Sequence, residues 1–210
     1  VPERMVARIA ADTKYWLWIN DQLVVFEGGL KRGASPCGTY YDQVDIAPFL
    51  KPGENTFAVL LWHFGKDGFS HVNSGKAALL FEAVAPGVEI VSDASWECAL
   101  YGAYQNTEAP YPNFRLPESN IRFDARLAQE GWNRSDFAGN LPRATVCYPA
   151  NEGPLGQLTP RPIPLWKDYG LRAYTSQRRT ERGDTLVCRL PYNAQVTPYP
   201  KVKAPAGRRI

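Results

Sequence analysis

The chain has 210 residues, of which 44% are apolar and 21% charged, and its formal net charge is +3. This composition excludes a disordered chain, and no apolar run approaches the roughly 18 to 20 residues that a membrane-spanning helix needs. With 17 glycines, 18 prolines, one methionine and 12% aromatic residues, the sequence predicts short strands joined by many turns, that is, an all-β protein.

The first expected elements are a strand over residues 6–11 and a hairpin over residues 15–26. The hairpin turns at Asn20-Asp21, a pair that suits a two-residue turn. The register that follows pairs Ile19 with Gln22, Trp18 with Leu23, Leu17 with Val24 and Trp16 with Val25. Both faces of this hairpin are apolar. Each face therefore requires a partner, a facing sheet on one side and a loop, a domain or a ligand on the other.

The middle of the chain alternates loops with further strands. GGLKRGASPCG is a glycine-rich loop, residues 44–50 form an approach segment in which Asp45 can cap a turn, and KPGEN is a strong turn. A polar loop with many aromatic residues covers 101–117, and GWNRSDFAG is a loop or a single helical turn. The later strands are expected at 56–64, 76–84, 88–91, 120–127, 186–190 and 194–197.

Turns at intervals of roughly 8 to 12 residues favour one antiparallel β-sandwich of the jelly-roll type over residues 6–127. The expected core residues are Leu17, Ile19, Val24, Val59, Leu61, Leu79 and Phe81.

The last fifty residues differ from the rest in charge. Residues 161–210 contain 11 Lys+Arg and 3 Asp+Glu, a charge of +8, which leaves −5 for residues 1–160. Several prolines predict a linker over 154–164 between a first unit, 1–153, and a basic unit, 165–210. So short a unit rarely has its own core, so we expect a truncated β unit or an extended tail. It lacks a nucleic-acid fold signature, and nucleic acid is not an expected partner.

The four cysteines, Cys37, Cys98, Cys147 and Cys188, are separated by 61, 49 and 41 residues. This spacing excludes a zinc knuckle and a thioredoxin-like pair. Free buried thiols are expected, and a single disulfide is the alternative.

The loop WHFGKDGFSHVNSG, residues 62–75, contains both histidines and is the leading candidate for a binding site. An aromatic ring here would stack on a sugar while the polar side chains bind its hydroxyls. Two alternatives are that Trp62 and Phe64 face the core, and that the histidines bind a metal. Tyrosines and amides in the 101–117 loop suit a carbohydrate or a protein interface equally. The candidate carbohydrate-binding residues are Trp62, His63, Asp67, His71, Asn73, Tyr101 and Tyr104.

No catalytic residue is predicted. Four aspartates, Asp42, Asp45, Asp93 and Asp124, lie beside strands or turns, where capping, an Asx-turn or an ion pair with Arg126 is the natural role. The chain lacks the G-x-S-x-G motif of serine hydrolases, and GGLKRG lacks the GK[ST] ending of a phosphate-binding loop.

Six segments stand in an informative order: DTKYWLWINDQLV, YYDQVDIAPFLKPGENTFAVLLWHFG, SDASW, SNIRFDARLAQEGW, RPIPLWKDYG and LPYNAQVTP. Together they resemble the N-terminal accessory region of bacterial α-L-rhamnosidases, glycoside hydrolase family 78. The hairpin and the PGEN turn alone occur in many galactose-binding-like sandwiches, but their order with FDAR and RPIPLW is more specific. Asp21 departs from the Asn-Gly turn usual in the family, and Asp is less favourable than Gly at that position.

The resemblance implies an accessory β-sandwich of a glycoside hydrolase that acts on rhamnose-containing glycans. In that family the paired catalytic carboxylates lie on an (α/α)6 barrel, and no stretch here is similar to it. The implied partners are that barrel in the same parent chain and a rhamnose-containing glycan, without a membrane. No cofactor is expected, although calcium stays open because some accessory modules of the family use it. A free-standing carbohydrate-binding module and a complete small hydrolase remain alternatives, as do a bacterial periplasmic and a cytoplasmic location.

Overall fold

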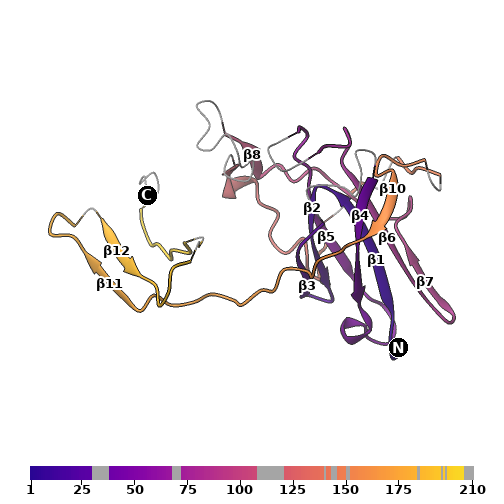
Figure 1. Ribbon diagram of the computed structural model, residues 1–210, viewed down its shortest axis with the longest axis horizontal. Helices are drawn as coiled ribbons and strands as arrows, with labels where there is room; N and C mark the ends of the chain where they lie inside the picture. The colour runs from indigo at the N-terminus through magenta and orange to yellow at the C-terminus, as the bar shows by residue number, and fades with distance from the viewer. Residues whose placement is uncertain are drawn as a thin grey trace. The chain divides into compact units, whose positions relative to one another are not determined.

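A computed structural model of the chain describes residues 1–29, 38–67, 72–107, 121–139, 141–142, 146–149, 152–183, 185–194, 196 and 198–205 (Figure 1). The chain divides into two compact units, Val1–Trp166 and Lys167–Ile210. Within the described ranges, no helix has the length and apolar character needed to cross a membrane.

The described secondary structure is almost entirely strand. Short 3-10 turns, η1 (Ala47–Phe49) and η3 (Ala125–Leu127), are the helical pieces. The strands are β1 (Val6–Asp12), β2 (Lys14–Ile19), β3 (Gln22–Gly28), β4 (Gly38–Asp45), β5 (Phe57–Trp62), β6 (Ala78–Ala85), β7 (Val88–Val91), β8 (Tyr104–Asn106), β9 (Ile121–Phe123), β10 (Gln157–Pro160), β11 (Ser176–Arg179) and β12 (Leu186–Arg189).

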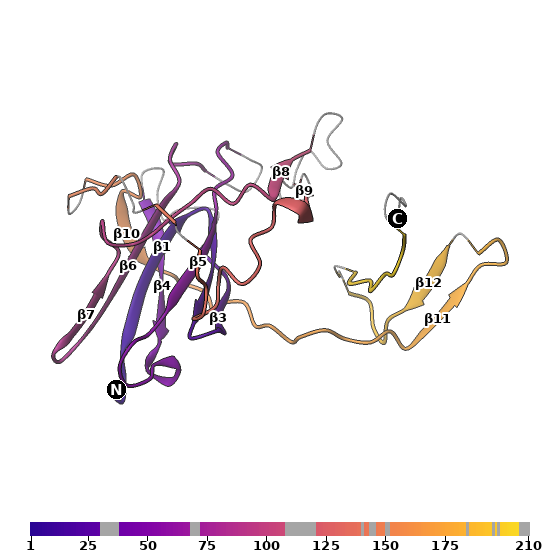
Figure 2. The same ribbon diagram turned by 180° about the vertical axis from the view of Figure 1, so that it is seen from behind.

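The first unit is a sandwich of two sheets, visible as two layers from both sides (Figures 1 and 2). One sheet has the strand order β10-β4-β1-β6-β7 and the other the order β3-β2-β5. All neighbours pair antiparallel except β10 and β4, which are parallel. The expected all-β sandwich is therefore confirmed.

The core lies between the two sheets, where alternate residues of each strand point inward. From β2, Tyr15, Leu17 and Ile19 are fully buried and pack in one cluster with Ile9 and Phe81 of the facing sheet. The remaining core residues expected from sequence are partly buried and pack against this cluster: Val24, Val59, Leu61 and Leu79. The predicted core is therefore confirmed, although these four positions lie at its edge.

The β2–β3 hairpin matches the predicted register only next to its turn. Asn20 and Asp21 both have positive φ, 48° and 70°, as a two-residue turn of this hand requires. The pairs Ile19–Gln22 and Trp18–Leu23 are confirmed, but Leu17 pairs with Val25 and Tyr15 with Gly28. The predicted pairs Leu17–Val24 and Trp16–Val25 are therefore wrong.

Two irregularities cause this difference, one between Leu17 and Trp18 and one between Tyr15 and Leu17, because an extra residue on one strand shifts every later pair. Val25 thereby turns into the core, where it is 1% exposed. Gly28 permits the close approach that follows, since a Cβ there would lie 2.2 Å from the ring of Tyr15.

Residues 157–160 fall in the segment expected to be a linker, yet they form strand β10 of the first unit. Pro160 is compatible with this position because β10 is an edge strand and needs no ladder hydrogen bond on its outer side. Strands β4, β8 and β11 were not predicted as separate strands. The strand expected over 194–197 is not observed at its two described residues, 194 and 196.

The second unit contains the β11–β12 hairpin and extended chain. None of its described residues is buried, and Leu171, Leu186 and Tyr192 are among its exposed apolar side chains. A two-stranded hairpin with so little burial is marginally stable by itself.

The described cysteines, Cys98, Cys147 and Cys188, are free thiols. Cys98 and Cys147 are exposed, so the expectation of buried thiols is wrong for these two; Cys188 is half-buried. Cys37 lies outside the described residues.

Candidate functional site

The outer face of the β3-β2-β5 sheet carries aromatic rings near the first candidate loop. Trp62 stacks on Trp16 of the neighbouring strand, with ring centroids 6.4 Å apart and an interplanar angle of 19°, and contacts Phe64 at 4.9 Å. The Nζ atom of Lys14 lies 5.8 Å from the Trp62 ring centroid and 3.1 Å from Glu27. Leu61, the strand neighbour of Trp62, packs against the core. Trp62 therefore points away from the core.

His63 points toward a different set of groups. Its Nδ1 atom lies 3.8 Å from Asp12 and is buried without a hydrogen-bond partner among the described residues. Asp12 accepts hydrogen bonds from the Thr13 hydroxyl, at 2.8 Å, and from the Ser74 amide, at 2.7 Å. Burial alone raises the pKa of Asp12, but these hydrogen bonds and nearby His63 outweigh it, and the pKa lies below its usual value. Asp12 therefore stays ionised and anchors two loops.

Asp67 and Asn73 serve the backbone of their own loop. The backbone amide of Asn73 donates to Asp67 Oδ1 at 2.8 Å, and the backbone amide of Gly75 donates to Asn73 Oδ1 at 2.9 Å. His71 lies outside the described residues. Within the described ranges, no three His, Cys, Asp or Glu side chains are grouped so as to hold a metal ion. The described candidates of this loop are thus not brought together at one point.

Tyr101 and Tyr104, from the second candidate loop, belong to a continuous row of rings, which we name the aromatic row. It begins at Trp18 on the outer sheet face, which meets Trp132 edge-to-face at 5.2 Å. Trp132 contacts Tyr101 at 6.1 Å, Tyr101 contacts Tyr104 at 5.4 Å, and Tyr104 contacts Phe123 at 4.9 Å. Residues far apart in sequence therefore form one surface.

The segment that carries Trp132 is tied to the turn of the β2–β3 hairpin. Ser135 donates its amide to Asp21 Oδ1 at 2.6 Å and its hydroxyl to Asp21 Oδ2 at 3.1 Å. A glycine at position 21 would suit the turn better but offers no such acceptor. Asp21 thus ties the segment that carries Trp132 to the hairpin turn, and Trp132 packs on Trp18 of the same hairpin.

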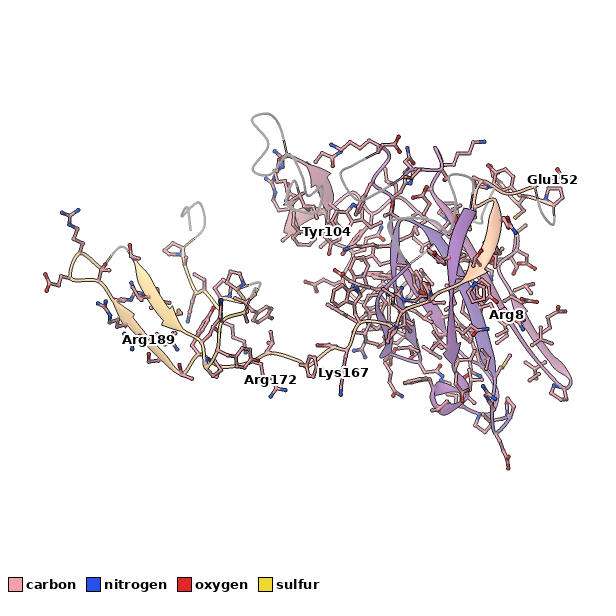
Figure 3. The ribbon with its side chains drawn as sticks, in the orientation of Figure 1. Arg8, Tyr104, Glu152, Lys167, Arg172 and Arg189 are labelled. Atoms are coloured by element: carbon pink, nitrogen blue, oxygen red, sulfur yellow. The ribbon has the colours of Figure 1, made fainter. Side chains whose placement is uncertain are left out.

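The outer end of the aromatic row lies on a short two-stranded ribbon, β8–β9, on which Tyr104 is labelled in Figure 3. Phe123 is the cross-strand partner of Tyr104. Beside them is a hollow of about 390 Å³ lined by Arg122, Phe123, Asp124, Ala125 and Arg126. Arg126 donates two side-chain hydrogen bonds to Asp124, at 2.8 and 2.5 Å, and lowers the pKa of Asp124 to about 2. Burial and neighbouring Tyr101 raise the pKa of Tyr104, which is therefore a neutral phenol at physiological pH.

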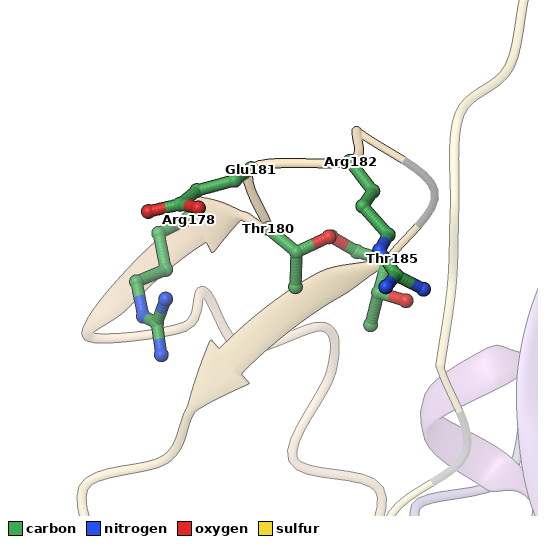
Figure 4. Close-up of a pocket in the computed structure, with 5 residues that line it drawn as sticks. All are labelled: Arg178, Thr180, Glu181, Arg182 and Thr185. Carbon is green, nitrogen blue, oxygen red and sulfur yellow. The ribbon is translucent and has the colours of Figure 1, made fainter.

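A second hollow, of about 480 Å³, lies at the tip of the β11–β12 hairpin (Figure 4). Its lining residues are Arg178, Thr180, Glu181, Arg182 and Thr185. Figure 4 shows Arg178 and Arg182 extending to opposite sides of Thr180. The lining contains no aromatic ring.

Among the described residues of the first unit, Asp42 on β4 is the least exposed charged side chain. It is fully buried and accepts hydrogen bonds from the Tyr15 hydroxyl and the Gly29 amide, both at 2.7 Å. Arg161, whose side chain is 5% exposed, donates to Asp42 Oδ1 at 3.1 Å and to the Gly29 carbonyl at 3.0 Å. Burial, and then the charge and hydrogen bond of Asp42, raise the pKa of Tyr15 well above its usual value, although Arg161 opposes this.

The other three aspartates considered above also accept structural hydrogen bonds. Asp45 accepts the amides of Met5 and Ala47, at 3.1 and 3.2 Å. Asp93 accepts the amide and the hydroxyl of Ser95, at 2.8 and 2.5 Å. The predicted ion pair of Asp124 with Arg126 is confirmed.

Neither a scan against protein-family models nor a search of curated proteins gave a match. Solved structures do match. The chain is similar to a family 78 rhamnosidase of Bacillus sp. GL1, with 30% identity and a TM-score of 0.66 over 79% of this chain and 17% of that one.

Two further structures share the fold. An α-L-rhamnosidase from Dictyoglomus thermophilum has 20% identity and a TM-score of 0.57 over 84% of this chain and 19% of that one. One from Aspergillus terreus has 22% identity and a TM-score of 0.58 over 88% of this chain and 21% of that one. The resemblance to family 78 rhamnosidases is confirmed, and the chain spans about a fifth of the length of these enzymes.

Proposed function

We propose that the chain is a non-catalytic accessory β-sandwich of an α-L-rhamnosidase-like glycoside hydrolase, one that acts on rhamnose-containing glycans. The observation that carries this proposal is the match to the Bacillus enzyme, which covers most of this chain but only 17% of that one. A region this small relative to the whole enzyme suits a supporting role. The carboxylates that cleave the sugar then come from another domain.

The described aspartates support this assignment. A glycosidase needs two carboxyl groups about 5 to 9.5 Å apart, one of them held protonated by a raised pKa. The pKa values of Asp12 and Asp124 are lowered instead, so neither side chain is protonated near neutral pH. Asp42 is buried against Arg161 and accepts hydrogen bonds on both oxygens, which suits a structural anchor.

The partner in this proposal is the catalytic barrel of the same parent chain, which the sandwich would position or stabilise. Two surfaces are available for that contact. One is the aromatic outer face of the β3-β2-β5 sheet, and the other is the hairpin unit with its exposed apolar side chains. The role needs no cofactor.

A free-standing carbohydrate-binding module is the second candidate. The aromatic row favours it, because exposed rings beside polar side chains are a common way to bind sugars.

The test is the reading frame that encodes this chain, followed by assay of its full-length product. We expect several hundred further residues with the pattern of a helical barrel, and rhamnosidase activity in the full-length protein. A reading frame that stops soon after Ile210 would overturn the accessory role and favour the binding module.

A further inference from the structure

The aromatic row becomes more open along its length. Trp18, Trp132 and Tyr101 are half-buried, whereas Tyr104 is 48% exposed and Phe123 49% exposed. Trp132 and Tyr101 each contact a ring on either side in the row, and Trp18 packs edge-to-face on Trp132, so packing explains the presence of these three rings. The two outer rings present nearly half of their surface to solvent, which packing alone does not require.

Planar polar groups surround these two rings. Arg122 hydrogen-bonds to Gln105 across the β8–β9 ribbon, and the Arg126 guanidinium, 87% exposed, holds Asp124. Each guanidinium carries five N–H donors, so both retain donors beyond these bonds. An ionised Asp124 adds an acceptor beside them. The hollow thus combines an apolar ring with fixed donors and acceptors.

This combination fits a saccharide better than a protein surface. A pyranose ring has an apolar C–H face that packs on an aromatic ring, and hydroxyls at its rim that need donors and acceptors. The hollow, about 390 Å³, is in the size range of small-molecule sites. Arginine is common at protein interfaces whereas aspartate is depleted there, so Asp124 is the lining residue that favours a saccharide.

The other candidate surfaces fit a sugar less well. Trp16 and Trp62 are half-buried and stack on one another, and Lys14 lies against the Trp62 ring. The hollow at the β11–β12 tip has no ring to pack against a sugar.

We propose that Tyr104 and Phe123, with Arg122, Asp124 and Arg126, form a saccharide-binding subsite on the β8–β9 ribbon. The choice of a rhamnose unit as its ligand rests on the proposed function. The methyl group at C6 of rhamnose extends the apolar face of the sugar, so it would contact the two exposed rings. The subsite would hold a glycan chain while a separate catalytic domain cleaves it.

The test is a titration of the full chain, followed by amide chemical shifts, with methyl α-L-rhamnopyranoside and a rhamnose-terminated disaccharide. Methyl α-D-glucopyranoside, which lacks the C6 methyl group, is the control sugar. We expect the rhamnosides to shift the amides of residues 104–106 and 121–126. Tyr104→Ala and Phe123→Ala should each weaken binding by up to about tenfold, the scale of one aromatic contact.

Three further variants keep the test decisive if an alanine variant unfolds the ribbon. Tyr104→Phe keeps the ring and should keep the affinity, while Arg126→Gln keeps both rings and should weaken binding. Tyr148→Ala removes another exposed tyrosine of the same unit, 41% exposed, and should bind normally.

Shifts centred on Trp16 or Trp62, or equal losses in Tyr148→Ala, would overturn the proposal. So would the absence of shifts with every sugar; in that case the ribbon would be a packing surface for another domain. This last result would leave the accessory role standing, because that role is tested by the activity of the full-length protein.

Discussion

Replacement of Arg161 by alanine should destabilise the first unit strongly, because it leaves Asp42 without its cationic partner. Both side chains are buried, 0% exposed for Asp42 and 5% for Arg161. Removal of one member of a buried ion pair costs about 3–5 kcal/mol. Asp42 keeps its hydrogen bonds from Tyr15 and Gly29, both at 2.7 Å. We therefore expect the lower end of that range, about 3 kcal/mol.

Urea unfolding followed by tryptophan fluorescence measures this loss. All six tryptophans lie between residues 16 and 166, so the signal reports the first unit. With a urea dependence of about 2 kcal/mol per M, the loss in Arg161→Ala corresponds to a midpoint lower by about 1.5 M.

An exposed ion pair of the same unit supplies the control. Arg8 and Glu82 are 3.3 Å apart with side chains 51% and 43% exposed, so Arg8→Ala should cost less than about 1 kcal/mol. The double variant Asp42→Asn/Arg161→Met should recover part of the loss, because it leaves no buried charge. If Arg161→Ala lowers the urea midpoint no more than Arg8→Ala does, the reasoning is refuted.

Three further predictions concern the core, the pH dependence and the second unit. Leu17→Ala should lower the free energy of unfolding by about 2–5 kcal/mol in the same urea assay, because the side chain is fully buried. Tyr15→Phe should cost about 1.5–3 kcal/mol at neutral pH, since the hydroxyl donates to the Asp42 carboxyl group that contacts Arg161. The folded state raises the pKa of Tyr15, so the stabilisation by its neutral hydroxyl is complete below pH 10 and is lost as the pH rises above 10. Tyr15→Phe has no hydroxyl and should not show this loss of stability. In hydrogen exchange, Leu186–Arg189 should exchange faster than Phe57–Trp62, because no described residue of the hairpin unit is buried.

Each of these three predictions would be contradicted by a specific result. Leu100, 96% exposed, is the control for the core, and an equal effect of Leu100→Ala and Leu17→Ala would contradict the assigned packing. If the wild type and Tyr15→Phe lose stability in parallel above pH 10, a group other than Tyr15 is responsible for the loss. Equal, strong protection of β12 and β5 would show that the second unit is a closed domain.

The sandwich could be predicted because short apolar stretches are separated by turn residues at intervals of roughly 8 to 12 residues, and this local pattern is present in the sequence. The register of the hairpin could not be predicted, because the sequence pattern does not show where the pairing of β2 and β3 becomes irregular. Strand β10 was missed for a similar reason. Its partner β4 is more than a hundred residues away, and Pro160 together with the prolines before and after the strand is typical of a linker.

The candidate sites were grouped by closeness in sequence, whereas side chains of adjacent strand residues point to opposite faces. Trp62 and His63 accordingly lie in different surroundings. The aromatic row, in contrast, joins residues between 18 and 132 and could not be assembled without the fold. The burial of Arg161 could not be predicted either, because charged residues are expected at the surface and its partner, Asp42, is 119 positions away in the sequence.

The assignment as a non-catalytic accessory sandwich is tested most directly by the release of nitrophenol from a nitrophenyl α-L-rhamnoside by the purified chain. We predict no release above the uncatalysed rate, because Asp42, Asp45 and Asp124 accept structural hydrogen bonds, and the pKa values of Asp12 and Asp124 are lowered, the opposite of what a general acid needs. Turnover that is abolished by Asp42→Asn, Asp45→Asn or Asp124→Asn would contradict the account.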